Sequence, residues 1–239
     1  MANDLSLLGA GASGATGFSP SDVSGLKLWL KADAIVGLSD GDPVTTWADS
    51  SGEGRDAAQA TASKKPTYQT AELNGKPVVR FDGVDDVLTF SIVALTDFSL
   101  FCVFYIPTVA DYAGPIDWRE FGISGFKLIS NVNTDWRPLL SKYDGAAETS
   151  NQMGPTAYPP PYGFAIESWL STPAYYENGS LQAISAGSAG WGNAGGAIAY
   201  SSFDYMAGDI AEIIVYDTAL SAGNRVSVED YLNNKYAIY

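Results

Sequence analysis

One stretch near the C-terminus, residues 208–236, constrains the fold of this chain more than any other part. It reads GDIAEIIVYDTALSAGNRVSVEDYLNNKY and begins with a β-branched run from Ile210 to Tyr216. The run is apolar at odd and even positions alike, which is typical of a strand covered on both faces. In a regular strand, one face would carry Ile210, Ile214 and Tyr216, and the other would carry Ala211, Ile213 and Val215.

A turn and a short helix are predicted after this strand. Asp217 interrupts the apolar run, and the hydroxyl of Ser221 can accept from a free amide in the first turn of a helix. The apolar residues that follow fall on one helical face: Val228, Tyr231, Leu232 and Tyr236.

Further strands are predicted along the chain, separated by turns that contain Asn-Gly or Asp-Gly. Leu26 to Leu30 is a short apolar run, and Phe98 to Ile106 is a longer one that suits a central strand. Asn178-Gly179 favours a hairpin because these residues accept the positive φ of a tight turn. Two stretches rich in aromatic residues, 107–165 and 185–204, have the composition of variable loops.

Five blocks together resemble laminin-G-like jelly-roll domains of the concanavalin A-like group. In order they are Gly25-Leu-x-Leu-Trp-Leu-x-Ala-Asp33, Trp47-x-Asp-x-Ser-Gly52, Arg55-Asp-Ala-x-Gln59, Asn74-Gly-x-Pro-Val-Val-Arg-Phe-Asp-Gly83, and the C-terminal stretch described above. The resemblance covers roughly residues 20–90 and 170–239. It implies an all-β fold, a jelly-roll sandwich of two antiparallel sheets with an N-terminal arm and a short C-terminal helix.

The first 19 residues have the composition of an arm rather than of a folded unit, so residues 20–239 are expected to form the jelly-roll domain. Within the arm the large apolar side chains are Leu5, Leu7, Leu8 and Phe18. Four such side chains offset only part of the cost of ordering so long a segment. We therefore expect the arm to anchor the protein in an assembly, through copies of itself, with a trimer favoured, and through other proteins.

The arm, the absence of a secretory signal, the single cysteine and the laminin-G-like body together favour a bacteriophage virion surface protein. It would decorate a head or belong to a tail or fibre, and it would be assembled in the host cytoplasm. A net charge of −14 argues against binding to nucleic acid or to an anionic membrane. No apolar stretch has the length of a membrane span.

Glycan binding is a second function to consider, either for such a virion protein or for a carbohydrate-binding adhesion module of a bacterial protein. Aromatic rings stack on sugar rings, while nearby polar groups bond the hydroxyls. Five aromatic residues in the loop-like stretches are candidates, although a residue of this kind taken alone is more often part of a core or an interface: Trp118, Trp136, Tyr158, Tyr162 and Trp191.

A glucanase-like hydrolase is the third reading, and the sequence disfavours it. The chain has no histidine, and no strand carries the alternating acidic residues with which glycosidases of this fold place two carboxylates in one cleft. Glu212 lies on the C-terminal strand without an acidic residue two positions away, so a structural role is predicted for it. Cys102 lies in an apolar run and is predicted to be a buried thiol.

Asp82, Asp85 and Asp86 form the best acidic cluster for a cation. Calcium binds six to eight oxygens, usually from several loops, and these carboxylates could supply some of them. The same residues are well suited to form a turn, which is the favoured reading. No other cofactor is predicted.

Overall fold

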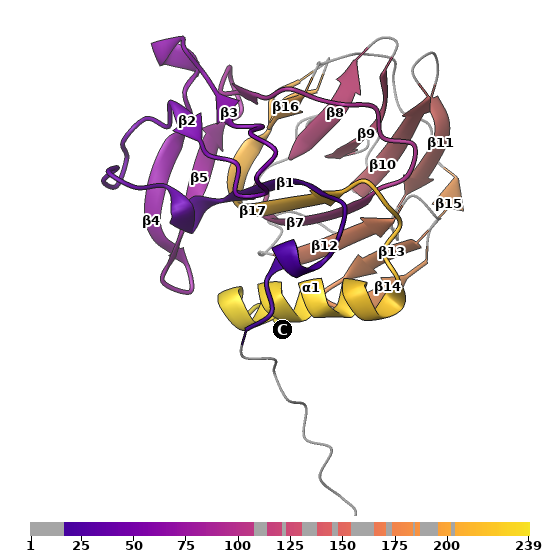
Figure 1. Ribbon diagram of the computed structural model, residues 1–239. Helices are drawn as coiled ribbons and strands as arrows, with labels where there is room; N and C mark the ends of the chain where they lie inside the picture. Colours follow the sequence, from indigo (N-terminus) through magenta and orange to yellow (C-terminus); the bar gives the residue numbers. More distant parts are fainter. Residues whose placement is uncertain are drawn as a thin grey trace, which may run out of the picture.

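The computed structural model describes residues 17–107, 114–120, 123–130, 138–144, 148–153, 165–170, 174–183, 185–186, 196–201 and 204–239. In this part of the chain two antiparallel sheets pack face to face, and one helix covers the outer face of one of them (Figure 1). The predicted jelly-roll sandwich of two antiparallel sheets is therefore confirmed. No helix among the described residues is long and apolar enough to cross a membrane.

Sheet A has eight strands, and its centre is β17 (Ala207–Tyr216). Along one edge β17 pairs with β7 (Ser99–Tyr105), and along the other it pairs first with β5 (Lys76–Asp82) and then with β1 (Leu26–Lys31). The remaining strands extend the sheet on both sides: β4 (Thr67–Leu73) beyond β5, and β12 (Ala165–Leu170), β13 (Ala174–Glu177) and β14 (Ser180–Gln182) beyond β7.

Sheet B has nine strands. In spatial order they are β15 (Ser185–Ala186), β11 (Glu148–Met153), β10 (Pro138–Asp144), β9 (Ile123–Ser130), β8 (Ile116–Glu120), β16 (Ala197–Ile198), β6 (Leu88–Thr89), β3 (Ala57–Ala58) and β2 (Thr46–Trp47). Short 3-10 helices occur at η1 (Pro20–Asp22), η2 (Ala32–Ala34) and η3 (Ala62–Lys64). Much of the stretch 107–165, expected as loops, thus consists of strands.

β17 is buried on both faces, as its sequence predicts, but its alternation differs from a regular strand. A register shift between Ile210 and Glu212 places Ile210 on the inner face with Ile213, and Ala211 on the outer face with Ile214. A bulge inserts one residue and so reverses which face the preceding residues occupy. The inner residues join the core between the sheets, here called the inner core.

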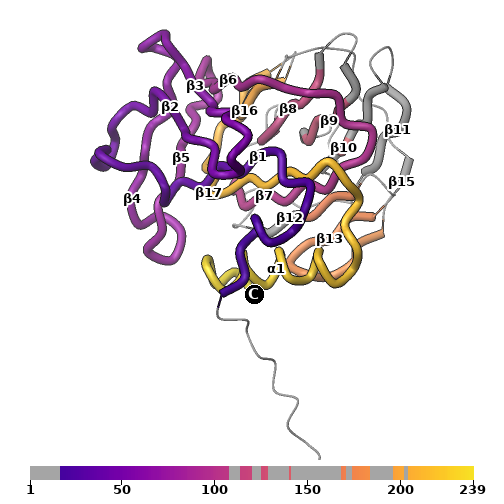
Figure 2. The backbone as a smooth tube through the Cα atoms, in the orientation of Figure 1, coloured from indigo at the N-terminus to yellow at the C-terminus, as the bar shows by residue number. Residues whose placement is uncertain are grey.

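The helix α1 (Ala222–Tyr236) packs on the outer face of sheet A and closes a second core, here called the helix-side core (Figure 1). The Ser221 hydroxyl accepts from the Asn224 amide at 3.3 Å, which is the predicted N-cap. Val228, Leu232 and Tyr236 are buried, so the predicted apolar face is confirmed. The first described residues begin beside the C-terminal end of α1 (Figure 2), where the Tyr216 hydroxyl donates to the Pro20 carbonyl at 2.9 Å.

Candidate functional site

Trp118 is a core residue, so the prediction that it stacks on a sugar from a loop is wrong. It lies on β8, has no exposed surface, and donates from Nε1 to the Val93 carbonyl at 2.9 Å. Its ring packs against Phe90 and Phe126 at centroid distances of 5.1 and 6.1 Å. The physical reason is the strand alternation, which directs Ile116 and Trp118 into the inner core. The other four aromatic candidates, Trp136, Tyr158, Tyr162 and Trp191, lie outside the described residues.

The same alternation sends charged side chains to the outer face of sheet B. Asp117 and Arg119 follow each other on that face of β8, and Lys127 of β9 lies directly opposite Asp117 in the register. Arg119 donates to Asp117 through Nε and Nη2, each at 2.8 Å, which is a two-pronged ion pair. All three residues are at most 1% exposed, so this part of the outer face is covered.

Two tyrosines lie on the segment that follows β16, the neighbour of β8 in sheet B. Tyr200 and Tyr205 are bridge partners across a tight turn, and their half-buried rings lie 4.7 Å apart between centroids. The Ala199 amide donates to the Pro115 carbonyl at 3.1 Å, which ties this turn to the start of β8. Burial, and then the neighbouring Tyr205 and Asp117, raise the pKa of Tyr200.

The tyrosine pair lies near the strand that carries the Asp117–Arg119 ion pair, because Ala199 is bonded to Pro115 and the charge of Asp117 contributes to the raised pKa of Tyr200. Flat ring faces and fixed polar groups are the two kinds of contact that sugar recognition uses. A sequence signal for the ion pair exists, because Ile-Asp-Trp-Arg alternates apolar and charged residues as a strand with one buried face does. The tyrosines come together only through the turn between β16 and β17, which the sequence does not reveal.

Glu212 has the structural role that the sequence predicts. It is 1% exposed and accepts from Trp29 Nε1 at 2.5 Å, from Lys235 Nζ at 2.7 Å and from the Tyr236 hydroxyl at 2.8 Å. Lys235 also donates to Asp33 at 2.7 Å. Both Glu212 oxygens are thereby occupied by groups that hold β1 and α1 against β17. Burial, followed by the charge of Glu212, raises the pKa of Tyr236 above its ordinary range.

A different acidic pair arises between strands rather than along one strand. The register of β12 and β13 places Glu167 directly opposite Glu177. The Tyr175 hydroxyl donates to Glu177 at 3.4 Å. The prediction of no hydrolytic site rests on acidic residues along single strands, and a pair formed across two strands is not visible in that pattern. A test of the prediction should therefore include Glu177.

The three acidic residues of the predicted cation cluster do come together. Asp82, Asp85 and Asp86 each place a carboxylate oxygen within 4.8 Å of the others. Asp82 Oδ1 accepts from the Val84 amide at 2.8 Å, and Asp86 Oδ2 accepts from the Asp82 amide at 2.9 Å. These bonds are those of a turn, while calcium binding stays a prediction. Burial, and then the charges of Asp82 and Asp85, raise the pKa of Asp86 to about 6.

Two other predictions concern Cys102 and the arm. Cys102 is fully buried in the inner core, as predicted. Phe18 packs against the helix-side core of its own chain. The other proposed assembly residues, Leu5, Leu7 and Leu8, lie outside the described residues.

The geometry can be compared with that of known proteins. No family model and no curated protein sequence matches the chain. Solved structures with a similar fold include the sialidase of Trypanosoma rangeli, with a TM-score of 0.55 and 15% identity over 88% of this chain and 33% of the sialidase. The chain therefore spans about a third of that enzyme's length.

Two further structures match over a larger share of their own length. Domain 4 of AbnA, a GH43 extracellular arabinanase of Geobacillus stearothermophilus in complex with arabinotriose, has a TM-score of 0.57 and 13% identity over 86% of this chain and 98% of that domain. The receptor-binding domain of botulinum neurotoxin type G has a TM-score of 0.58 and 14% identity over 88% of this chain and 52% of its own. At these identities the likeness establishes the jelly-roll fold alone.

Proposed function

We propose that the protein is a non-enzymatic carbohydrate-binding module and that the Tyr200–Tyr205 pair forms its sugar-contact site. The observation that carries this proposal is the pair of half-buried tyrosine rings, 4.7 Å apart between centroids, on a segment that is hydrogen-bonded to the start of β8. The likeness to the arabinanase domain gives further support, because that domain has nearly the same extent and was solved with arabinotriose.

The tyrosines and the ion pair have different roles in this site. The ring faces of Tyr200 and Tyr205 would pack against the C–H face of a sugar, and their hydroxyls would exchange hydrogen bonds with sugar hydroxyls. Asp117 and Arg119 are buried on β8, so they would act as positioning residues that fix this strand and the local electrostatic field. The three donors that occupy Glu212 support a non-enzymatic function, because that carboxylate is unavailable for acid or base chemistry.

A glycan array followed by calorimetric titration of the best ligand tests the proposal. Tyr200→Ala and Tyr205→Ala are each expected to weaken binding by roughly tenfold, since loss of a stacking aromatic costs on the order of 1 kcal/mol or more. Tyr239→Ala is the matched control, because Tyr239 is 52% exposed and lies at the C-terminus. Unchanged affinity in both test variants, with normal folding, would refute the assignment of this site.

The place of this module on a bacteriophage particle stays a proposal from the sequence. Residues 1–19 would anchor it, and of these residues 1–16 lie outside the described part of the chain. Deletion of residues 2–17 should leave a soluble, folded, monomeric jelly roll that no longer enters particles, measured by gel analysis of purified particles. Normal incorporation of the shortened protein would contradict the proposed anchor.

A further inference from the structure

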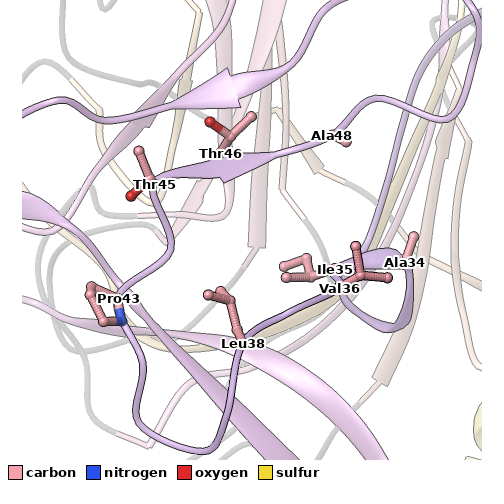
Figure 3. A pocket seen from close by; sticks show the side chains of 8 residues that line it. All are labelled: Ala34, Ile35, Val36, Leu38, Pro43, Thr45, Thr46 and Ala48. Atoms are coloured by element: carbon pink, nitrogen blue, oxygen red, sulfur yellow. The ribbon is translucent and has the colours of Figure 1, made fainter.

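A half-open apolar cleft of about 310 Å³ lies between η2 and β2. Ile35, Val36 and Leu38 lie on one side of this cleft, and Thr46 and Ala48 lie on the other (Figure 3). No side chain that lines it is charged, and none contains a buried polar atom without a hydrogen-bond partner. The polar groups that still need a partner therefore lie elsewhere, inside the fold rather than at this opening.

Five buried polar side-chain atoms in the described part of the chain have no hydrogen-bond partner, and three of them belong to β12 and α1. These three are Ser168 Oγ on the strand, and Arg225 Nε and Glu229 Oε1 on the helix. Their residues are 1%, 8% and 2% exposed. Buried polar groups in folded proteins are nearly always hydrogen-bonded, so each of these atoms is expected to have a partner.

The strand register places Ser168 and Arg225 at the same part of the outer face of sheet A. Ser168 lies opposite Phe101, a residue of the helix-side core, and on its other side it lies opposite Tyr176. Residues directly opposite each other in an antiparallel pair direct their side chains to the same face. The Arg225 guanidinium lies over the Tyr176 ring, 3.6 Å from its centroid. The hydroxyl, the ring and the guanidinium are therefore neighbours where α1 contacts β12.

Hydrogen bonds hold α1 in place at both of its ends. Before its start, the Ser99 hydroxyl donates to the Thr218 carbonyl at 2.8 Å and accepts from the Leu220 amide at 2.9 Å. At its end, Asn74 Nδ2 donates to the Tyr236 carbonyl at 2.6 Å. A shift of the helix that paired the three atoms with other protein groups would break these bonds. The partner that the atoms need must therefore fit between a fixed helix and a fixed sheet.

The charges of this site balance, which selects a neutral partner. Arg225 Nη1 donates to Glu229 Oε2, one turn further along α1, so the two side chains form an ion pair. The site then presents a guanidinium N–H donor, a carboxylate acceptor and a hydroxyl that can do either. Water is small, neutral and able to donate and accept, and a buried water typically makes about three hydrogen bonds to such groups.

We propose that ordered water binds between α1 and β12 and is hydrogen-bonded by Ser168 Oγ, Arg225 Nε and Glu229 Oε1. This internal hydration site joins the helix to sheet A through polar contacts, as Val228 and Leu232 join it through apolar ones. The inference is independent of the proposed sugar site, because it concerns the outer face of the other sheet.

Nuclear magnetic resonance of the full-length protein tests the proposal directly. A long-lived water beside Arg225 gives a dipolar cross-peak between water and the Nε–H proton, and in a rotating-frame experiment this peak has the opposite sign to one caused by proton exchange. Loss of the signal in Arg225→Lys assigns it. The Nε–H of Arg119 is the matched control, because Arg119 is also buried and donates from Nε to Asp117 at 2.8 Å, so no such cross-peak is expected there. A missing dipolar cross-peak at Arg225 would overturn the proposal.

Removal of the Ser168 hydroxyl gives an independent measurement. If this hydroxyl binds water, Ser168→Ala loses a hydrogen bond and should lower Tm by roughly 2–4 °C. Ser99→Ala is the matched control and should lower Tm by a similar amount, because Ser99 is an equally buried serine of sheet A with two protein partners. An unpaired buried hydroxyl destabilises a fold, so its removal would leave Tm unchanged or raise it. That result in Ser168→Ala, beside a lowered Tm in Ser99→Ala, would overturn the proposal.

Discussion

Replacement of Glu212 by glutamine removes one charge from the centre of the contacts that join β1, β17 and α1. The carboxylate accepts from three donors, at 2.5 Å from Trp29 and at 2.7 and 2.8 Å from Lys235 and Tyr236. Glutamine retains one acceptor oxygen and replaces the other with a donor. At least one of the three donors must then face the new N–H group, and half-buried Lys235 loses its most deeply buried partner while it keeps Asp33 and the Tyr231 hydroxyl.

The cost can be estimated from these contacts. A hydrogen bond to a charged group contributes about 1.5–3 kcal/mol, and loss of one member of a buried ion pair costs about 3–5 kcal/mol. The two estimates describe overlapping contacts, so we expect Glu212→Gln to lower the free energy of unfolding by about 3–4 kcal/mol. For a chain of this size each 1 kcal/mol corresponds to about 2–4 °C, which predicts a fall in Tm of roughly 10 °C.

Guanidinium and thermal unfolding, followed by circular dichroism, measure this change. Glu72→Gln is the matched control, because Glu72 pairs with Arg80 at 3.4 Å and both side chains are about 40% exposed. An exposed pair of this kind contributes about 0–1 kcal/mol. A loss below 1 kcal/mol in Glu212→Gln would show that these buried contacts do not hold α1 in place, and the argument for a structural Glu212 would fail.

Two further predictions concern other buried charged groups, and a third concerns hydrolysis. The pKa of Asp86 is raised from 3.8 to about 6, so the folded state binds the proton of this group more tightly than the unfolded state does. The contribution of Asp86 to the stability should therefore rise as the pH falls from above 6 towards 4. Asp86→Asn should therefore raise the free energy of unfolding at pH 8 by about 1 kcal/mol, because solvent screening reduces the effect that the full pKa shift would have. A loss of stability of this variant in chemical denaturation at pH 8 would contradict the prediction. Arg225 and Glu229 form a buried ion pair on α1 in which Arg225 Nε and Glu229 Oε1 have no hydrogen-bond partner among the described residues. Replacing both residues by leucine should therefore lower the free energy of unfolding less than replacing either one alone. Additive losses of stability in a double-mutant cycle would contradict this. Purified protein should release no reducing sugar from laminarin, and a release that Glu177→Gln abolishes would show a hydrolytic site.

The sequence predicts the elements before residue 107 and after residue 206 better than those of the stretch between them. β1, β7, β17 and α1 have clear apolar patterns and unambiguous ends, and the structure confirms each of them. The strands β8 to β11 fall in a stretch rich in aromatic, glycine and proline residues, whose composition resembles that of loops. The bulge in β17 cannot be predicted from the sequence either, because a run that is apolar on both faces keeps the same pattern after a shift of one residue.

The misassigned role of Trp118 and the unrecognised charged cluster have one cause. In β8, a residue's face is decided by pairing with β9 and β16, and composition alone cannot separate an aromatic residue that fills a core from one that meets a ligand. Once the register is known, Ile116 and Trp118 must face inward, and Asp117 and Arg119 must face outward. A one-residue slip of β8 would bury the ion pair in the inner core and expose the tryptophan. The packing of Trp118 therefore fixes the register that keeps Asp117 and Arg119 on the outer face of β8, and the core residue supports the proposed sugar site without touching the sugar.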